Sequence, residues 1–244
     1  MQGLAEVVPV SSSAHLVLVP WLLGWPDPAS LADQQGRTTL AAGLHAGSCA
    51  GIALALLPHR PDARTAALAA ATCLPAAVAG LLAADAVERR LGRPGQLAGL
   101  LAGAGAAMWM ADRRPETAVV GPREAAAAAL AQCAALVPGV SRSGATLTAM
   151  RALRVGRVEA ARFSLLMSLP VTAGAAALTL VSADRALLGA LARPLAVGAP
   201  AAAGTAYAMT RALARRGPTG AGPVALYRLG LAAVVAVRLG RGRP

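Results

Sequence analysis

Long apolar stretches alternate with short polar segments along the chain, and the polar segments carry most of the arginines. A helix of about 20 residues covers the roughly 30 Å hydrocarbon core of a bilayer, because each residue adds about 1.5 Å. Six apolar stretches approach this length, so the pattern predicts six transmembrane helices. They are Thr39–Leu57, Ala66–Ala84, Leu97–Ala111, Phe163–Val181, Leu187–Met209 and Val224–Leu239.

Two further apolar stretches, residues 2–24 and 125–153, are interrupted near their middle. Pro9 breaks the first and Pro138-Gly139 breaks the second, because proline lacks a backbone N–H and glycine tolerates positive φ. The arms are too short to cross a bilayer, so they predict two re-entrant helical hairpins; such irregular backbone is tolerated only inside protein or beside a wet cavity. The expected fold class is an all-α polytopic membrane protein, with residues 1–244 forming a single integral membrane domain.

The two interrupted stretches also resemble each other. Val8-Pro9-Val10-Ser11-Ser12-Ser13 matches residues 137–143, V-P-G-V-S-R-S, once one extra glycine is allowed, and L-A-E at 4–6 matches L-A-Q at 130–132. Paired, proline-interrupted apolar segments are typical of inverted-repeat membrane proteins, whose site lies where the repeats meet. We therefore predict one repeat over about residues 1–111 and a second over about 125–240. The alternative is that V-P-x-S recurs by chance in a chain rich in alanine, valine and serine.

Composition supports a membrane protein, since 56% of the residues are hydrophobic and the mean hydropathy is +0.56. The net charge of +12 is also typical of proteins that bind nucleic acid. All 23 basic residues are arginine, however, and they lie mostly between apolar runs, where the positive-inside rule explains them better. We expect no nucleic acid partner. The uneven distribution of arginines predicts that the face carrying Arg60, Arg113 and Arg151 is cytoplasmic and that both chain ends lie outside.

The second break carries the polar groups best suited to an anion. Ser141, Ser143 and Thr146 supply hydroxyls around Arg142, whose guanidinium matches phosphate oxygens two at a time. Backbone N–H groups after Gly139 are expected to add an anion-binding nest at a helix start. The alternative is a buried structural arginine whose donors are satisfied by carbonyls.

The first break carries a carboxylate and an imidazole. Gln2 and Glu6 are four residues apart and share a helix face, so their oxygens are suited to a hard divalent cation. His15 follows the serine run, and an imidazole there can transfer a proton or attack phosphorus. Taken alone, Glu6 could equally be an exposed helix-start glutamate and His15 a packing residue. His45 is expected to serve in packing or to support the site from behind.

Two motifs carry a family resemblance: P-G-x-S-R-S-G-x-T beginning at Pro138, and Q-G-L-x-E-x-x-P-x-S-S-S-x-H over residues 2–15. Together they resemble the undecaprenyl pyrophosphate phosphatases, the bacterial membrane phosphatases also linked to bacitracin resistance. Weaker similarity covers most of the chain, including Leu44–Gly47, Ala161–Ser164 and Tyr227-Arg228.

The resemblance implies hydrolysis of a polyprenyl diphosphate to the monophosphate and inorganic phosphate, which recycles the carrier lipid for cell-wall synthesis. It implies a multi-pass protein of the bacterial plasma membrane with an outward-facing site. It also implies a divalent cation (Mg²⁺ or Ca²⁺) at Gln2 and Glu6. A homodimer is compatible with the resemblance. The nucleophile stays open between His15, Ser12 and a water activated by Glu6. The implied catalytic residues are Glu6, Ser12, His15 and Arg142, and the implied substrate-binding residues are Ser11, Ser13, Gly139, Ser141, Ser143 and Thr146.

Two rival functions were weighed. A non-enzymatic carrier or flippase of an anionic lipid or solute would share the inverted-repeat architecture, but would not need hydroxyls clustered beside Glu6 and His15. A different lipid phosphatase class shares the Ser141-Arg142 pair, but the histidine that should follow is missing.

Two departures from the family pattern are also visible. Ala14 stands where the family usually has glycine, and only Met1 precedes Gln2 where the family has a longer apolar arm. From the short arm we expect either a start codon upstream of Met1 or a truncated first hairpin.

Overall fold

The computed structural model describes residues 1–25, 34–218 and 220–242, and the regular elements in these ranges are helices. The helices form two groups along the chain, one before residue 113 and one after it. Each group begins with a pair of short helices. The first comprises α1 (Gln2–Val7), α2 (Ser12–Leu23), α4 (Gln34–Leu56), η1 (Leu57–His59), α5 (Ala63–Ala71), α6 (Cys73–Arg90) and α7 (Pro94–Asp112). The second comprises α8 (Pro122–Cys133), η2 (Ala134–Leu136), α9 (Arg142–Ala152), α10 (Arg157–Ser182), α11 (Arg185–Arg216) and α12 (Gly222–Gly240).

Five helical segments of the described chain are long and apolar enough to cross a membrane, as expected for a polytopic membrane protein. Four of the six predicted spans lie within them, and a fifth, Ala66–Ala84, overlaps Ala63–Ala83 except at its last residue. The sixth, Leu97–Ala111, lies within the 19-residue helix α7 but is not among the five candidates, so its assignment as a span stays a prediction. The candidates are Gln35–His59, Ala63–Ala83, Arg157–Ser182, Arg185–Arg216 and Gly222–Gly240.

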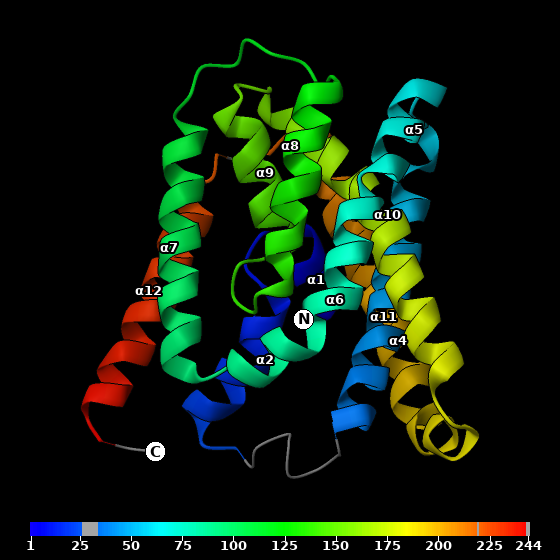
Figure 1. Ribbon diagram of the computed structural model, residues 1–244, viewed down its shortest axis with the longest axis vertical. Coiled ribbons are helices and arrows are strands. Elements are labelled where there is room, and N and C mark those ends of the chain that lie inside the picture. The colour runs from blue at the N-terminus through cyan, green and yellow to red at the C-terminus, as the bar shows by residue number, and fades with distance from the viewer. Residues whose placement is uncertain (26–33, 219, 243–244) are drawn as a thin grey trace.

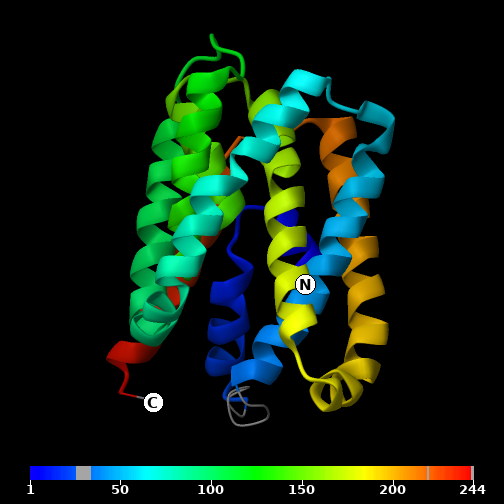
Figure 2. The same ribbon diagram turned by 45° about the vertical axis from the view of Figure 1, so that its right-hand side comes forward.

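The short helices lie between two groups of long ones (Figures 1 and 2). On one side α4 packs against α10 and α11, and on the other α7 packs against α12. Helix α1 contacts α4 and α11, whereas α9 contacts α7 and α10, so both breaks are enclosed by long helices. In Figure 1, α8 runs from one end of the bundle to its middle and α9 returns from there, while α2 runs from the middle to the opposite end.

Close packing on one side depends on small residues. A Cβ added at Gly47 or Gly51 of α4 would overlap the backbone of Ala199 or Ala203 in α11. Glycine therefore lets the two backbones approach each other, as small residues do in membrane helix pairs.

The observed boundaries correct several predicted ones. The second interrupted stretch begins with Pro122 rather than Ala125, because proline suits the first helical position and the Glu124 carboxylate accepts a hydrogen bond from the Gly121 N–H. The predicted Ala66–Ala84 span is broken at Thr72. There Gln132 Nε2 donates to the Thr72 carbonyl at 3.2 Å, a contact that local periodicity does not reveal.

The methyl group of Ala14 fits the fold although the family pattern favours glycine at this position. Ala14 is fully buried and packs with Leu18, Leu97 and Val235 in one core cluster. Its φ is not among the positive values of the described chain, so the position does not demand glycine.

Candidate active site

A carboxylate and a guanidinium meet at the two breaks. Glu6 lies in α1 and Arg142 begins α9, yet Arg142 Nη2 lies 3.3 Å from Glu6 Oε1 and 3.4 Å from the Glu6 main-chain oxygen. Arg142 Nη1 also donates to the Ser164 carbonyl at 3.0 Å, and its Nε is buried without a partner. The guanidinium is therefore held on one side and keeps one unused donor.

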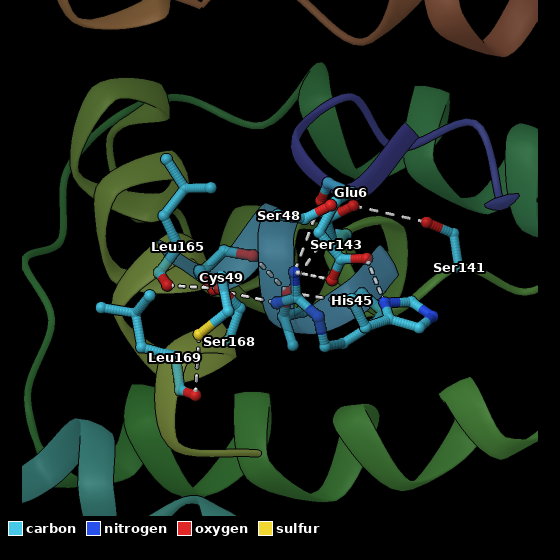
Figure 3. A network of polar contacts seen from close by, with 12 residues as sticks. Glu6, His45, Ser48, Cys49, Ser141, Ser143, Leu165, Ser168 and Leu169 are labelled. Carbon is cyan, nitrogen blue, oxygen red and sulfur yellow. Dashed lines mark hydrogen bonds and ion pairs between the residues drawn. The ribbon is translucent and has the colours of Figure 1, made fainter. Parts of the chain in front are cut away.

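The second oxygen of the Glu6 carboxylate contacts His45 and Gln2. His45 Nδ1 lies 2.9 Å from Glu6 Oε2, and Gln2 Nε2 lies 3.2 Å from the same oxygen. Gln2 and Glu6 thus share a helix face as predicted. His45, expected in packing or behind the site, touches the carboxylate directly (Figure 3). The L-H-A-G string around it was the signal that could have placed it here.

The two breaks have the same local geometry. Ser11 and Ser141 each precede a helix with positive φ, 71° and 73°, which residues other than glycine rarely adopt. In each break the hydroxyl pairs with that of the serine two residues on, at 3.2 Å for Ser11 and Ser13 and 3.4 Å for Ser141 and Ser143. The two breaks thus share the positive φ of the serine before the helix and the hydroxyl pair that follows it.

A cavity of about 800 Å³ opens beside the Glu6–Arg142 contact. The polar part of its wall comes from both breaks and from α4: Glu6, His45 and Arg142, with Ser11, Ser12, Ser13, Ser141 and Ser143. Figure 3 shows Glu6, His45, Ser141 and Ser143 gathered in one place. The remaining wall is largely apolar, including Leu81 and Leu178. A pocket that is polar at one end and apolar elsewhere suits a ligand of the same character.

Four predicted site residues do not line the cavity. Gln2 contacts Glu6 and His45 through its Nε2, and the other three, His15, Gly139 and Thr146, lie behind the wall. His15 Nδ1 lies 2.7 Å from the Ser11 carbonyl oxygen, and its Nε2 lies 2.6 Å from the Tyr227 hydroxyl. Thr146 Oγ1 bonds to Ser164 Oγ at 2.7 Å, and the Gly139 carbonyl accepts from Arg228 at 2.7 Å. In the structure these three residues support the breaks, and their catalytic or binding roles stay predictions.

Comparison with known proteins identifies the family of this chain. The family described as "Bacitracin resistance protein BacA" matches residues 1–234. The chain belongs to the BacA family. It is 37% identical to the undecaprenyl-diphosphatase of Pelobacter propionicus, over 85% of this chain and 82% of that protein. It is also 37% identical to the undecaprenyl-diphosphatase of Gemmatimonas aurantiaca, over 98% and 92% of the two chains, and 40% identical to that of Geobacter metallireducens, over 73% and 71%.

Membership of the BacA family confirms the predicted resemblance. The curated relatives are named as diphosphatases, so the alternative of a non-enzymatic carrier finds no support among them.

The residues of this BacA family member fit a divalent cation that is shared with phosphate oxygens. Glu6 is the acidic side chain in the cavity wall, and no group of three histidine, cysteine, aspartate or glutamate side chains suited to a metal occurs among the described residues. Magnesium is commonly held by one or two carboxylates together with substrate phosphates, rather than by a closed protein cage. Glu6, with Gln2 beside it, meets that requirement.

Proposed function

We propose that this chain hydrolyses undecaprenyl diphosphate to undecaprenyl phosphate and inorganic phosphate at the site formed by Glu6 and Arg142. The observation that carries the proposal is the 3.3 Å contact between these residues, which joins the two breaks beside a cavity lined by serine hydroxyls. The relatives bear the name of this activity. The diphosphate would occupy the polar end of the cavity, and the apolar remainder is suited to the polyprenyl chain.

Arg142 and the start of α9 are the groups best placed to bind the diphosphate. A guanidinium contacts two phosphate oxygens at once, and Arg142 lies in the cavity wall. The N–H groups at the first turn of α9 add positive partial charge at the same point. Phosphoryl transfer builds charge on the equatorial oxygens, so fixed donors of this kind lower the barrier.

Attack on phosphorus is best assigned to a group in the cavity wall. Ser12 and a water beside Glu6 both meet this condition, whereas His15 Nε2 is already engaged by the Tyr227 hydroxyl. The attacking oxygen forms a bond to the terminal phosphorus, and the bond from that phosphorus to the bridging oxygen breaks. Undecaprenyl phosphate leaves with the bridging oxygen. When water attacks, inorganic phosphate forms in this step; when Ser12 attacks, water then hydrolyses the phosphoserine and releases inorganic phosphate. Glu6, in contact with His45, is placed to accept the proton of the attacking group.

A divalent cation, Mg²⁺ or Ca²⁺, is part of the proposal. Glu6 would hold it, with Gln2, whose Nε2 lies 3.2 Å from Glu6 Oε2, beside it. When bound, the cation would neutralise charge on the phosphate oxygens.

The membrane arrangement is likewise proposed. Support for an inverted repeat, about residues 1–111 and 125–240, comes from the equivalent serines with φ of 71° and 73° and from their matching hydroxyl pairs. In that arrangement α1–α2 and α8–α9 are re-entrant hairpins that meet at bilayer depth, in a plasma membrane, with the site open to the outer side. A homodimer stays a prediction from the resemblance.

Phosphate release by the purified protein in detergent tests the proposal. With undecaprenyl diphosphate and Mg²⁺ the parent protein should release inorganic phosphate, and a chelator should stop the release. A variant with Arg142→Lys serves as the matched site control, and Arg64→Lys, in the first turn of α5, as the remote control. Binding of the lipid without phosphate release by the parent would contradict the proposed function.

A further inference from the structure

One buried arginine outside the predicted site touches both breaks. Arg228 of α12 is fully buried, although its guanidinium carries a charge. Its Nη1 donates to the Pro9 carbonyl at 3.0 Å, and its Nη2 donates to the carbonyls of Gly139 and Val140 at 2.7 and 3.1 Å. Its Nε donates to the Leu101 carbonyl of α7 at 3.3 Å. One planar group thus joins the two breaks and two long helices.

These contacts fix the direction of the peptide groups at the breaks. A trans peptide holds its C=O and N–H on opposite sides. Because the Val140 carbonyl faces Arg228, the N–H of Ser141 points away from Arg228, at the start of α9 where the diphosphate is proposed to bind. The Pro9 carbonyl faces the same guanidinium, so the first break is held from the same side.

The surroundings of Arg228 are shaped to receive it. A Cβ added at Gly144 would lie 3.0 Å from Arg228 Nη1, and one added at Gly105 would lie 3.2 Å from Arg228 Cβ. The glycine of the S-R-S-G string therefore leaves room for the guanidinium. Among the described residues, the ion pairs of acidic groups involve Arg142, Arg151, Arg157 and His45, and none involves Arg228. Its positive charge is instead stabilised by the dipoles of the carbonyls that accept its hydrogen bonds.

We infer that Arg228 is a positioning residue that holds both active-site breaks in register, an inference that rests on the proposed function. Ser11 and Ser141 have backbone conformations that persist only when their surroundings fix them. Arg228 supplies that constraint at the peptide directly before Ser141, through the Val140 carbonyl, and one peptide further back from Ser11, through the Pro9 carbonyl. Its uncompensated charge also raises the electrostatic potential around the bound diphosphate.

The test compares Arg228→Lys with Arg151→Lys. Arg151 is a suitable control because it is also buried, and it also donates to main-chain carbonyls, those of Asp112, Arg114 and Val155. None of its hydrogen bonds reaches the carbonyls of Pro9, Gly139 or Val140 that Arg228 binds. A lysine keeps the charge but offers a single nitrogen, which cannot span Pro9 and Gly139 as the guanidinium does.

We expect Arg228→Lys to lower kcat about tenfold or more, which corresponds to the loss of contacts made only in the transition state. Stabilisation of the protein by inorganic pyrophosphate, measured as a shift of the thermal midpoint, should fall in the same variant. Arg151→Lys should lower the thermal midpoint without changing kcat or the pyrophosphate shift.

Two results would overturn the positioning role. One is a kcat of Arg228→Lys within about twofold of the parent. The other is an equal loss of kcat in both variants in proportion to their lost stability. The proposed function fails separately, through absence of phosphate release in the parent protein. In that case the shift of the thermal midpoint by inorganic pyrophosphate still compares diphosphate binding in the two variants, because this measurement does not depend on turnover.

Discussion

The imidazole of His15 and the phenol of Tyr227 lie parallel, with ring centroids 5.6 Å apart and an interplanar angle of 5°. The Tyr227 hydroxyl lies 2.6 Å from His15 Nε2, and the Ser11 carbonyl lies 2.7 Å from Nδ1. Both ring nitrogens are therefore engaged. The carbonyl can only accept, so Nδ1 carries the proton and Nε2 accepts from the tyrosine in the neutral ring.

This relationship predicts a modest effect of Tyr227→Phe. The variant keeps the stacked ring but removes the hydroxyl, so His15 loses one partner while the break keeps the other. We expect kcat to fall about three- to tenfold with KM nearly unchanged, the cost of one hydrogen bond of about 1 kcal/mol. His15→Ala, which removes both contacts, should be clearly more severe. Equal activity of Tyr227→Phe and parent would show that Nε2 needs no partner.

Replacement of Arg142 by lysine is predicted to remove most activity. A lysine ammonium is a point charge and cannot contact Glu6 and the Ser164 carbonyl from separate nitrogens while binding phosphate. We expect a loss of about a hundredfold in kcat/KM, measured by phosphate release. Activity within about threefold of the parent would contradict the contact of the Arg142 guanidinium with two phosphate oxygens.

The Glu6 carboxylate is predicted to set the cation requirement. In Glu6→Gln the charge that balances Arg142 and holds the cation is lost, so activity should vanish or need a much higher Mg²⁺ concentration. Gln2→Glu adds a carboxylate four residues away on the same helix face and should be tolerated. An Mg²⁺ titration of both variants gives the comparison. The same midpoint in Glu6→Gln and parent would place the cation elsewhere.

His45→Gln forms a separate test of the contact that the sequence did not reveal. The substitution keeps a hydrogen-bonding group near Glu6 Oε2 but removes the group that can be protonated. We expect a lower kcat. A variant whose kcat matches that of the parent would limit His45 to packing or to support from behind the site, as first expected.

Asp112 is predicted to stabilise the packing of the end of α7 against α9, α10 and the start of α12. It lies just beyond the predicted Leu97–Ala111 span. Its carboxylate accepts from Arg157 Nε at 2.8 Å, Arg151 Nε at 3.3 Å and the Ala221 N–H at 2.9 Å. Burial by itself raises the pKa of Asp112, but the hydrogen bonds from Arg157 and Ala221 and the charges of both arginines hold it below its usual value.

Because the folded-state pKa of Asp112 is lowered, its contribution to stability is present above the ordinary aspartate pKa of about 3.9. The contribution is lost as the pH falls through the lower folded-state pKa. Asp112→Asn should therefore reduce the free energy of unfolding at pH 7 by about 1–3 kcal/mol, the value of hydrogen bonds to a charged group. Thermal unfolding of parent and variant should converge below about pH 4. A constant difference from pH 7 to pH 3 would exclude this titration.

Much of the architecture is determined by the sequence alone, because it depends on local patterns. Apolar length identifies the helices, and Pro9 and Pro138-Gly139 identify the breaks, since neither residue needs a distant partner to disrupt a helix. The clustered hydroxyls beside Arg142 and the four-residue spacing of Gln2 and Glu6 are equally local. They led to the family and to most of the cavity wall.

Only the tertiary structure decided which distant groups touch. The contacts of Glu6 with His45 and Arg142, of His15 with Tyr227, and of Arg228 with both breaks join residues on different helices. Helical periodicity specifies the face of one helix, but not the neighbour that this face meets. At these buried positions each charge or donor needs a partner, because an unpaired one is costly away from water. The packing of α4, α9 and α12 around the two breaks selects that partner.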